Sequence, residues 1–239
     1  MNASVSLALQ SINWSFSKLS MYESCPYRFK LKYIERCPEP PLPPDNPLER
    51  GNRIHNRLEK FIKGEGPMDT EARAIGKFHK LLEHLQLLYT VGMATAEDDW
   101  WFDKDWEPCQ RSDVRLWVKL DYNVLDEKEA HAIVGDWKSG KSTYKAVDHI
   151  QQTQLYAAAT AIKFEWADKI TAELPYVDEG WVRSSTYTRE EALRFVGRFE
   201  QRAQRIYNDK FFRPNPNVQT CRYCPFNRKG TGACAVAAL

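Results

Sequence analysis

The chain has 239 residues, of which 43% are hydrophobic and 13% aromatic, which is enough to form the core of a folded domain. Its 34 basic and 32 acidic residues nearly cancel, so composition neither demands nor excludes a polyanionic partner. No stretch approaches the roughly 18 to 20 apolar residues of a membrane helix, and the N-terminus lacks secretory-signal features, so we expect an intracellular protein with no membrane association.

The N-terminal part of the chain is predicted to be helical. Residues 15–36 have helical character, with Ser17 as N-cap and a break at Pro26. The proline-rich segment that follows is predicted to be a loop. Helical spacing of apolar residues then predicts one helix over 48–64 and a second over 70–90.

The pattern changes to strands from about residue 97. Alternating apolar residues predict a strand over 113–126, and an apolar run predicts another over 131–138; a polar turn joins the two into a hairpin. The remaining predicted elements are a helix over 148–164, short strands near 169–177 and 181–187, and a helix over 188–208. A cysteine-bearing tail closes the chain.

The triplet Asp-x-Lys occurs twice, and its context differs between the two places. Asp126 and Lys128 lie in the polar turn, whereas Asp136 and Lys138 end a predicted strand and point to the same face. A buried aspartate needs a cation, a metal ion or a hydrogen-bond network. The second triplet is therefore either a structural ion pair or part of a functional site.

Three further positions favour a functional site. Asp121 lies on the preceding strand of the hairpin, and two carboxylates brought together repel unless a divalent ion lies between them. His55 on the helix over 48–64 is a potential third ligand. Gln152 and Tyr156, four residues apart, share one face of the helix that follows the hairpin. Each of these residues alone is as easily explained by packing as by function.

The succession of these residues resembles the RecB-like nucleases of the PD-(D/E)XK superfamily. In chain order the matching residues are Gly51, His55, Asp121, Asp136, Lys138, Gln152 and Tyr156. The resemblance implies an α/β fold with a restriction-endonuclease-like core, in which helices flank a central mixed sheet. It also implies a metal-dependent DNA nuclease.

The resemblance assigns a role to each residue of the site. His55, Asp121, Asp136 and the backbone carbonyl of Trp137 would bind Mg²⁺ or Mn²⁺, ions that prefer hard oxygen and imidazole ligands. Lys138 would position or activate the attacking water. From the adjacent helix, Gln152 and Tyr156 would hold Lys138 or a phosphate of the substrate in position.

The cysteines point to a second metal site. Cys221 and Cys224 have the C-x2-C spacing, Cys234 follows, and Cys25 is the best candidate for a fourth ligand. Because Cys25 and Cys224 each precede a proline, the pattern resembles the iron-sulfur branch of the same family, which includes CRISPR-associated adaptation exonucleases and the AddAB nuclease domain. That branch implies a [4Fe-4S] cluster joining the ends of the chain. Zinc remains an alternative, because the sequence does not distinguish zinc from iron-sulfur on four thiolates. The spacing from Cys224 to Cys234 is longer than expected for the branch.

Together these interpretations predict a single nuclease domain over 1–239, with a core over 48–210 and a cluster subdomain from residues 15–40 and 211–239. The implied substrate is single-stranded DNA or DNA ends, cleaved as an exonuclease rather than an endonuclease, in the cytoplasm of a bacterium, an archaeon or a phage-infected cell. The sequence leaves open whether the protein has a helicase or recombination partner and whether it forms an oligomer. The alternative is a noncatalytic DNA-binding or assembly module that keeps the fold.

Aromatic and basic residues that could stack bases or contact phosphates are scattered along the chain. They are Tyr22, Tyr27, Arg28, Trp100, Trp101, Phe211, Phe212 and Arg213. The sequence does not separate such roles from ordinary packing for any one of them.

Overall fold

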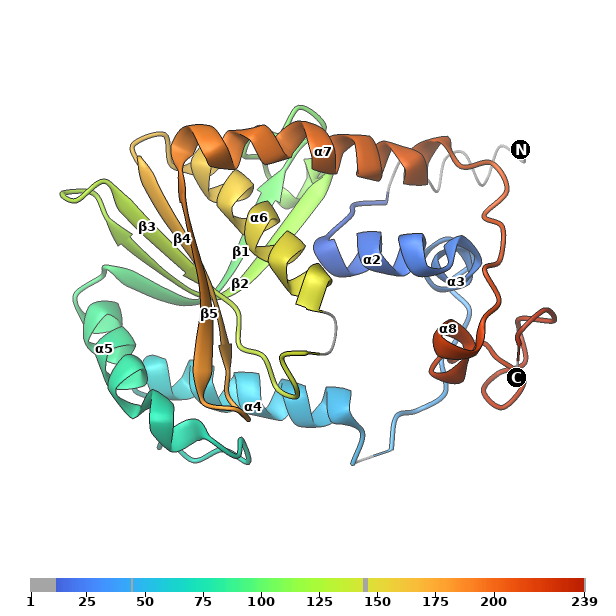
Figure 1. The fold of residues 1–239 in the computed structure, drawn as a ribbon, viewed down its shortest axis with the longest axis horizontal. Helices are drawn as coiled ribbons and strands as arrows, with labels where there is room; N and C mark the ends of the chain where they lie inside the picture. The colour runs from blue at the N-terminus through green and yellow to red at the C-terminus, as the bar shows by residue number, and fades with distance from the viewer. Residues whose placement is uncertain (1–11, 44, 144–145, 239) are drawn as a thin grey trace. The chain divides into compact units, whose positions relative to one another are not determined.

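The computed structural model describes residues 12–43, 45–143 and 146–238 (Figure 1). The chain divides into two compact units. One runs from Pro43 to Val196, and the other is built from both ends of the chain, Met1–Leu42 and Gly197–Leu239. We call them the sheet unit and the end unit. Their combination into a single nuclease domain remains a prediction.

The sheet unit contains five strands in the order β1-β2-β3-β4-β5 (Figure 1). The strands are β1 Ala94–Phe102, β2 Leu116–Asp126, β3 His131–Gly135, β4 Lys169–Tyr176 and β5 Trp181–Thr188. Neighbouring strands are antiparallel except β3 and β4, which run parallel because helix α6 (Ala146–Lys163) connects them as a crossover. The predicted mixed sheet is confirmed.

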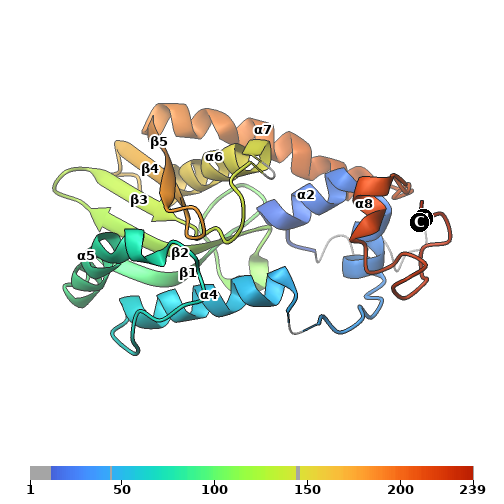
Figure 2. The same ribbon diagram turned by 60° about the horizontal axis from the view of Figure 1, so that its bottom comes forward.

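Helices cover both faces of this sheet. Helices α4 (Pro47–Ile62) and α5 (His79–Thr90) lie on one side and α6 lies on the other, as Figure 2 shows. The neighbouring residues Ala132 and Ile133 of β3 explain the arrangement. Ala132 packs in a core with α6, whereas Ile133 packs against the core formed with α4 and α5, as strand alternation requires.

Most predicted elements of the sheet unit are confirmed, with two corrections. The chain forms a strand over 94–102 that the sequence did not delimit. The helix predicted over 70–90 begins only at His79, after a 3-10 turn over Ile75–Phe78. The reason is a competing set of bonds, because the N–H of Ala74 donates to the carbonyl of Val177 at 3.0 Å and the N–H of Arg73 donates to Asp178 at 2.9 Å.

The end unit combines N-terminal helices with the C-terminal segment. Its elements are α2 (Phe16–Ser24), α3 (Pro26–Phe29), a π-helical turn over Lys30–Ile34, α8 (Val218–Arg222) and the second half of α7 (Arg189–Asn208). The helix break at Pro26 is confirmed. The N-cap is Ser15 rather than the predicted Ser17, and its hydroxyl accepts from the N–H of Lys18 at 3.4 Å.

Aromatic rings hold the two chain ends of this unit together. Phe29 stacks on Phe212, with ring centroids 6.3 Å apart, and Tyr22 meets both rings edge-on. The Tyr22 hydroxyl donates to Asp209 at 2.8 Å. Residues distant in sequence thus share one small core. None of the described helices combines the length and apolar character required to cross a membrane.

Candidate metal centre

Three side chains from three elements bring potential metal ligands together in the sheet unit. His55 lies on α4, Glu97 on β1 and Asp121 on β2, and one ligand atom from each lies within 4.8 Å of the other two. In the antiparallel register of β1 and β2, Glu97 and Asp121 both fall between the pairs Ala96–Tyr122 and Asp98–Leu120. His55 and Asp121 were predicted ligands, whereas Glu97 was not, because it is one of three consecutive acidic residues with no distinguishing spacing.

Asp121 connects α4 to the end of β3. One carboxylate oxygen lies 3.0 Å from His55 Nδ1, and the other accepts the backbone N–H of Trp137 at 2.6 Å. The Trp137 indole is buried between the rings of Phe78 and Tyr122. This packing fixes the backbone between Asp136 and Lys138. The role of the Trp137 carbonyl as a ligand remains a prediction.

Asp136 and Lys138 form an ion pair after the end of β3. Asp136 also accepts from the Tyr156 hydroxyl at 2.8 Å and from Gln152 Nε2 at 3.2 Å, and Gln152 donates to Tyr156 at 2.6 Å. Gln152 and Tyr156 therefore hold Asp136 in this structure, and their predicted contact with Lys138 or a phosphate stays a prediction. Among the described residues, the group of potential metal ligands comprises His55, Glu97 and Asp121 and does not include Asp136. The Asp136 carboxylate faces helix α6, where Gln152 and Tyr156 lie.

The charges of the site perturb one another. Burial alone would lower the pKa of His55, but the carboxylates of Asp121 and Asp136 outweigh it and raise the pKa. Burial opposes ionisation of Asp136, yet Lys138 and His55 hold its pKa below the usual value. For Glu97, burial raises the pKa, and the nearby charge of Asp121 raises it further against the effect of Lys119.

The donor set fits a divalent cation. Two carboxylates and one imidazole are hard ligands that suit Mg²⁺ or Mn²⁺. Glu97 is only partly buried, and partial burial together with the charge of Asp121 raises its pKa and so disfavours its charged form. A bound cation would relieve that cost, and His55, Glu97 and Asp121 are the residues that would hold it.

A histidine that the sequence did not single out lies close to this site. His149 on α6 precedes Gln152 by one helical turn, and its Nδ1 lies 2.8 Å from the hydroxyl of Tyr176. Burial and the charge of Lys138 lower the pKa of His149 to about 4. The ring is therefore neutral near pH 7.

The turn between β4 and β5 is anchored beside the site by Asp178. Its carboxylate accepts two bonds of 2.8 Å from Arg50 of α4, and the N–H groups of Arg73 and Gly140 each donate to it at 2.9 Å. The same region is tightly packed, since a Cβ on Gly51 would lie 3.1 Å from the Ser139 hydroxyl oxygen. Asp178 thus ties α4 to the loop after Lys138.

These bonds predict a pH-dependent contribution to stability. The hydrogen bonds from Arg50, opposed by burial, lower the pKa of Asp178 from 3.8 to about 2. A lowered carboxyl pKa stabilises the fold above the unfolded value, so this contribution, about 2 kcal/mol, is complete above about pH 5 and is lost as pH falls towards 2.

Urea unfolding at pH 6 and pH 2.5 tests this contribution. We expect Asp178→Asn to destabilise the protein at pH 6 and to lose most of that difference at pH 2.5. Asp105→Asn, which removes an exposed carboxylate paired with Lys104, should change neither value. An equal cost of Asp178→Asn at both pH values would contradict the assignment.

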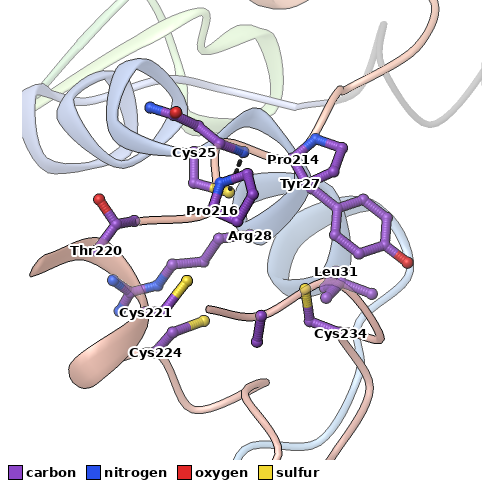
Figure 3. Close-up of a pocket in the computed structure, with 12 residues that line it drawn as sticks. Cys25, Tyr27, Arg28, Leu31, Pro214, Pro216, Thr220, Cys221, Cys224 and Cys234 are labelled. Carbon is purple, nitrogen blue, oxygen red and sulfur yellow. Dashed lines mark hydrogen bonds between the residues drawn. The ribbon is translucent and has the colours of Figure 1, made fainter. Parts of the chain in front are cut away.

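In the end unit, the four predicted cysteines line one pocket (Figure 3). Cys25 precedes α3, Cys221 and Cys224 belong to α8 and the turn after it, and Cys234 comes from the C-terminal tail. Burial raises the pKa of the Cys224 thiol, while the charge of Arg28, which also lines the pocket, acts in the opposite direction. The structure thus gathers the four cysteines without showing what they bind.

A tight turn accommodates the long spacing before Cys234. The N–H of Thr231 donates to the Pro225 carbonyl at 2.9 Å, and the N–H of Cys234 donates to the Phe226 carbonyl at 2.8 Å. A Cβ on Gly230 would lie 2.1 Å from the Pro225 oxygen, so glycine is required there. The extra glycine-rich residues therefore return Cys234 to the pocket.

Cys37 and Cys109 do not line this pocket. Cys37 packs beside the small core of Leu31 and Phe226, and the backbone N–H of Cys109 donates to the Trp101 carbonyl. Both are free, partly exposed cysteines. They provide controls for experiments on the other four.

The five-stranded mixed sheet brings together His55, Asp121 and the Asp136–Lys138 pair. The model of the PD-(D/E)XK nuclease superfamily matches residues 13–228, so the chain belongs to this superfamily. Among solved structures, a chain titled "Crystal structure of SSO0001" is similar, with 13% sequence identity and a TM-score of 0.47, over 95% of this chain and 87% of that one. No curated protein sequence matches the chain.

Proposed function

We propose that this protein is a divalent-metal-dependent deoxyribonuclease that acts as an exonuclease on single strands or DNA ends. The observation that carries the proposal is the convergence of His55, Glu97 and Asp121 next to the Asp136–Lys138 pair. Superfamily membership implies a nucleic-acid substrate. The choice of DNA, of single strands and of exonucleolytic cleavage goes beyond these observations and rests on the family resemblance.

Each residue contributes a distinct part of the chemistry. When bound by His55, Glu97 and Asp121, a divalent ion supplies charge that offsets the phosphate and lowers the pKa of a coordinated water. Lys138 provides a positive charge and a proton donor beside that position. Gln152 and Tyr156 fix the orientation of Asp136 through their hydrogen bonds.

Degradation of end-labelled DNA tests the proposal. We expect cleavage of a linear single strand with Mn²⁺ or Mg²⁺ and none with EDTA, because the acidic site requires a cation. A circular single strand of similar sequence is the matched control, since it has no ends and should stay intact. A ladder from the linear strand would give the cleavage polarity. DNA binding without cleavage in either metal would favour the noncatalytic module.

We further propose that Cys25, Cys221, Cys224 and Cys234 hold a [4Fe-4S] cluster. All four line one pocket. Cys25 and Cys224 each precede a proline, as in the iron-sulfur branch that the sequence resembles, and this resemblance supports a cluster over a single zinc ion.

Metal analysis of protein purified without oxygen tests the cluster. We expect about four iron atoms per chain and a brown colour, both lost in Cys221→Ser and kept in Cys109→Ser. Cys109 is outside the pocket, so its replacement controls for general effects of thiol removal. Colourless protein with one zinc ion per chain would exclude the cluster and establish the alternative.

The setting that we propose is the cytoplasm of a bacterium, an archaeon or a phage-infected cell, where DNA ends arise during recombination and repair. A helicase or recombination protein is the partner that would supply such ends. Co-purification with the full chain tests for it.

A further inference from the structure

An exposed tryptophan lies at the same edge of the sheet as Asp136 and Lys138. Strands β3 and β4 are parallel, so their C-terminal ends meet there. Lys138 extends this pairing, because it bridges Tyr176 and its N–H donates to the Pro175 carbonyl at 2.9 Å. Trp181 pairs with Tyr176 across the β4–β5 hairpin. Trp181 therefore lies two strand spacings, about 10 Å, from Lys138.

The Trp181 indole is fixed in place and partly open to solvent. It stacks on Tyr176, with ring centroids 4.7 Å apart and an interplanar angle of 24°. Tyr176 is completely buried and held by His149, and the Trp181 indole N–H donates to Glu179 at 3.1 Å. The indole is nevertheless 38% exposed. A ring already held in this way loses little conformational entropy when another ring stacks on it.

The charges around Trp181 suit a polyanion. The guanidinium of Arg183 lies 5.5 Å from the centre of the indole ring. The acidic groups of the hairpin turn are engaged, since Asp178 binds Arg50 and Glu179 accepts from the N–H of Ser142 and from the Trp181 indole. Arg183 thus offers positive charge beside the indole, and Lys138, paired with Asp136, lies next to Tyr176 on the neighbouring strand.

Four of the aromatic residues singled out from the sequence are less suitable. Trp100 and Phe212 are each 1% exposed and Tyr22 is 7% exposed, so these rings belong to cores and cannot stack a base. Phe211 is exposed but belongs to the end unit. Trp181 combines exposure, a fixed ring and a place beside the site.

We propose that Trp181 is a stacking platform for an unpaired nucleobase of the strand whose backbone lies at Lys138. This inference rests on the proposed nuclease function and identifies its preferred substrate as single-stranded or frayed DNA. A base inside a duplex is stacked between its neighbours and must leave the stack, at a cost, before it reaches the indole. Trp181 would thereby select unpaired ends.

Equilibrium binding in EDTA, where no cleavage occurs, tests the platform. The ligands are a fluorescent single strand of thymidines, an abasic strand of equal length and a blunt duplex. We expect Trp181→Leu, which keeps an apolar side chain over Tyr176 but removes the aromatic face, to weaken single-strand binding about tenfold. Binding of the abasic strand and the duplex should not change, and Trp181→Phe should restore most of the affinity.

The control is Trp117→Leu. Trp117 is a partly exposed tryptophan on β2 whose indole N–H also donates to a carboxylate, Asp99, at 2.9 Å, and its replacement should leave all three affinities unchanged. Unchanged single-strand binding by Trp181→Leu, or equal losses for single and abasic strands, would overturn the platform. These results do not depend on cleavage, so a wild-type protein that binds single strands but cuts nothing would refute the nuclease proposal alone.

Discussion

Replacement of Asp136 by Asn is expected to reduce metal-dependent cleavage by more than a hundredfold. Asp136 receives hydrogen bonds from Tyr156 and Gln152 and pairs with Lys138, so its charge is placed and oriented by three other side chains. Removing a residue that only hydrogen-bonds to a metal ligand typically lowers metal affinity or activity by about 10-fold to 100-fold. Removing a ligand itself, or the counterion of Lys138, should lower activity further.

The second Asp-x-Lys triplet provides the matched control for this variant. Asp126 accepts backbone N–H bonds from Lys128 and Glu129 in an exposed turn, so Asp126→Asn should keep full activity. The comparison requires that both variants fold, which circular dichroism and thermal unfolding can verify. We expect Asp136→Asn to remain folded, because asparagine keeps the shape and can still accept a bond from Tyr156. Wild-type activity in Asp136→Asn would remove Asp136 from the site.

Replacement of Gly135 by Ala is expected to destabilise the protein by about 3 kcal/mol, through overpacking. A Cβ at this position would lie 2.0 Å from Cζ of Tyr122 and 2.2 Å from its Cε1. The Tyr122 ring cannot move away easily, because it is buried and its hydroxyl donates to Glu173 of β4 at 3.0 Å. Any displacement would also disturb Asp136, the next residue.

Urea unfolding of Gly135→Ala measures this cost, with Gly197→Ala as the control. Gly197 is exposed within helix α7 and has no atom within 4 Å of its added Cβ, so alanine there should stabilise the helix by about 1 kcal/mol. The same chemical change thus has opposite expected signs at the two positions. A Gly135→Ala protein as stable as wild type would show that the Tyr122 ring can relocate.

The features that the sequence predicted well are those encoded by local pattern. The alternation before Asp126 and the apolar run before Asp136 predict a hairpin, and the hairpin brings Asp121 next to the Asp136 region as expected. The four cysteines also meet in one pocket, although their spacing alone does not require it. Alternating apolar residues carried the information for the hairpin, whereas the family resemblance carried it for the cysteines.

The features that the sequence missed depend on pairing between distant segments. Glu97 becomes a candidate ligand only through its register against Asp121, which no local pattern specifies. The helix predicted from residue 70 starts later because Arg73 bonds to Asp178, more than a hundred positions along the chain. The sequence placed Gln152 and Tyr156 on one helix face, but their hydrogen bonds to Asp136 depend on side-chain rotamers that no local pattern specifies.

The end unit combines segments that are far apart in the sequence, so its two parts are synthesised at different times. Tyr22 and Phe29 leave the ribosome long before Phe212, and at 5 to 20 residues per second the delay is roughly 10 to 40 s. All five strands are synthesised within this interval, so the sheet can form during translation while the first helices wait for their partners. Cys25 likewise meets Cys221 only after the segment between them has been synthesised. Assembly of the cysteine pocket therefore requires synthesis through Cys234, and a chain that stops before this residue cannot complete it.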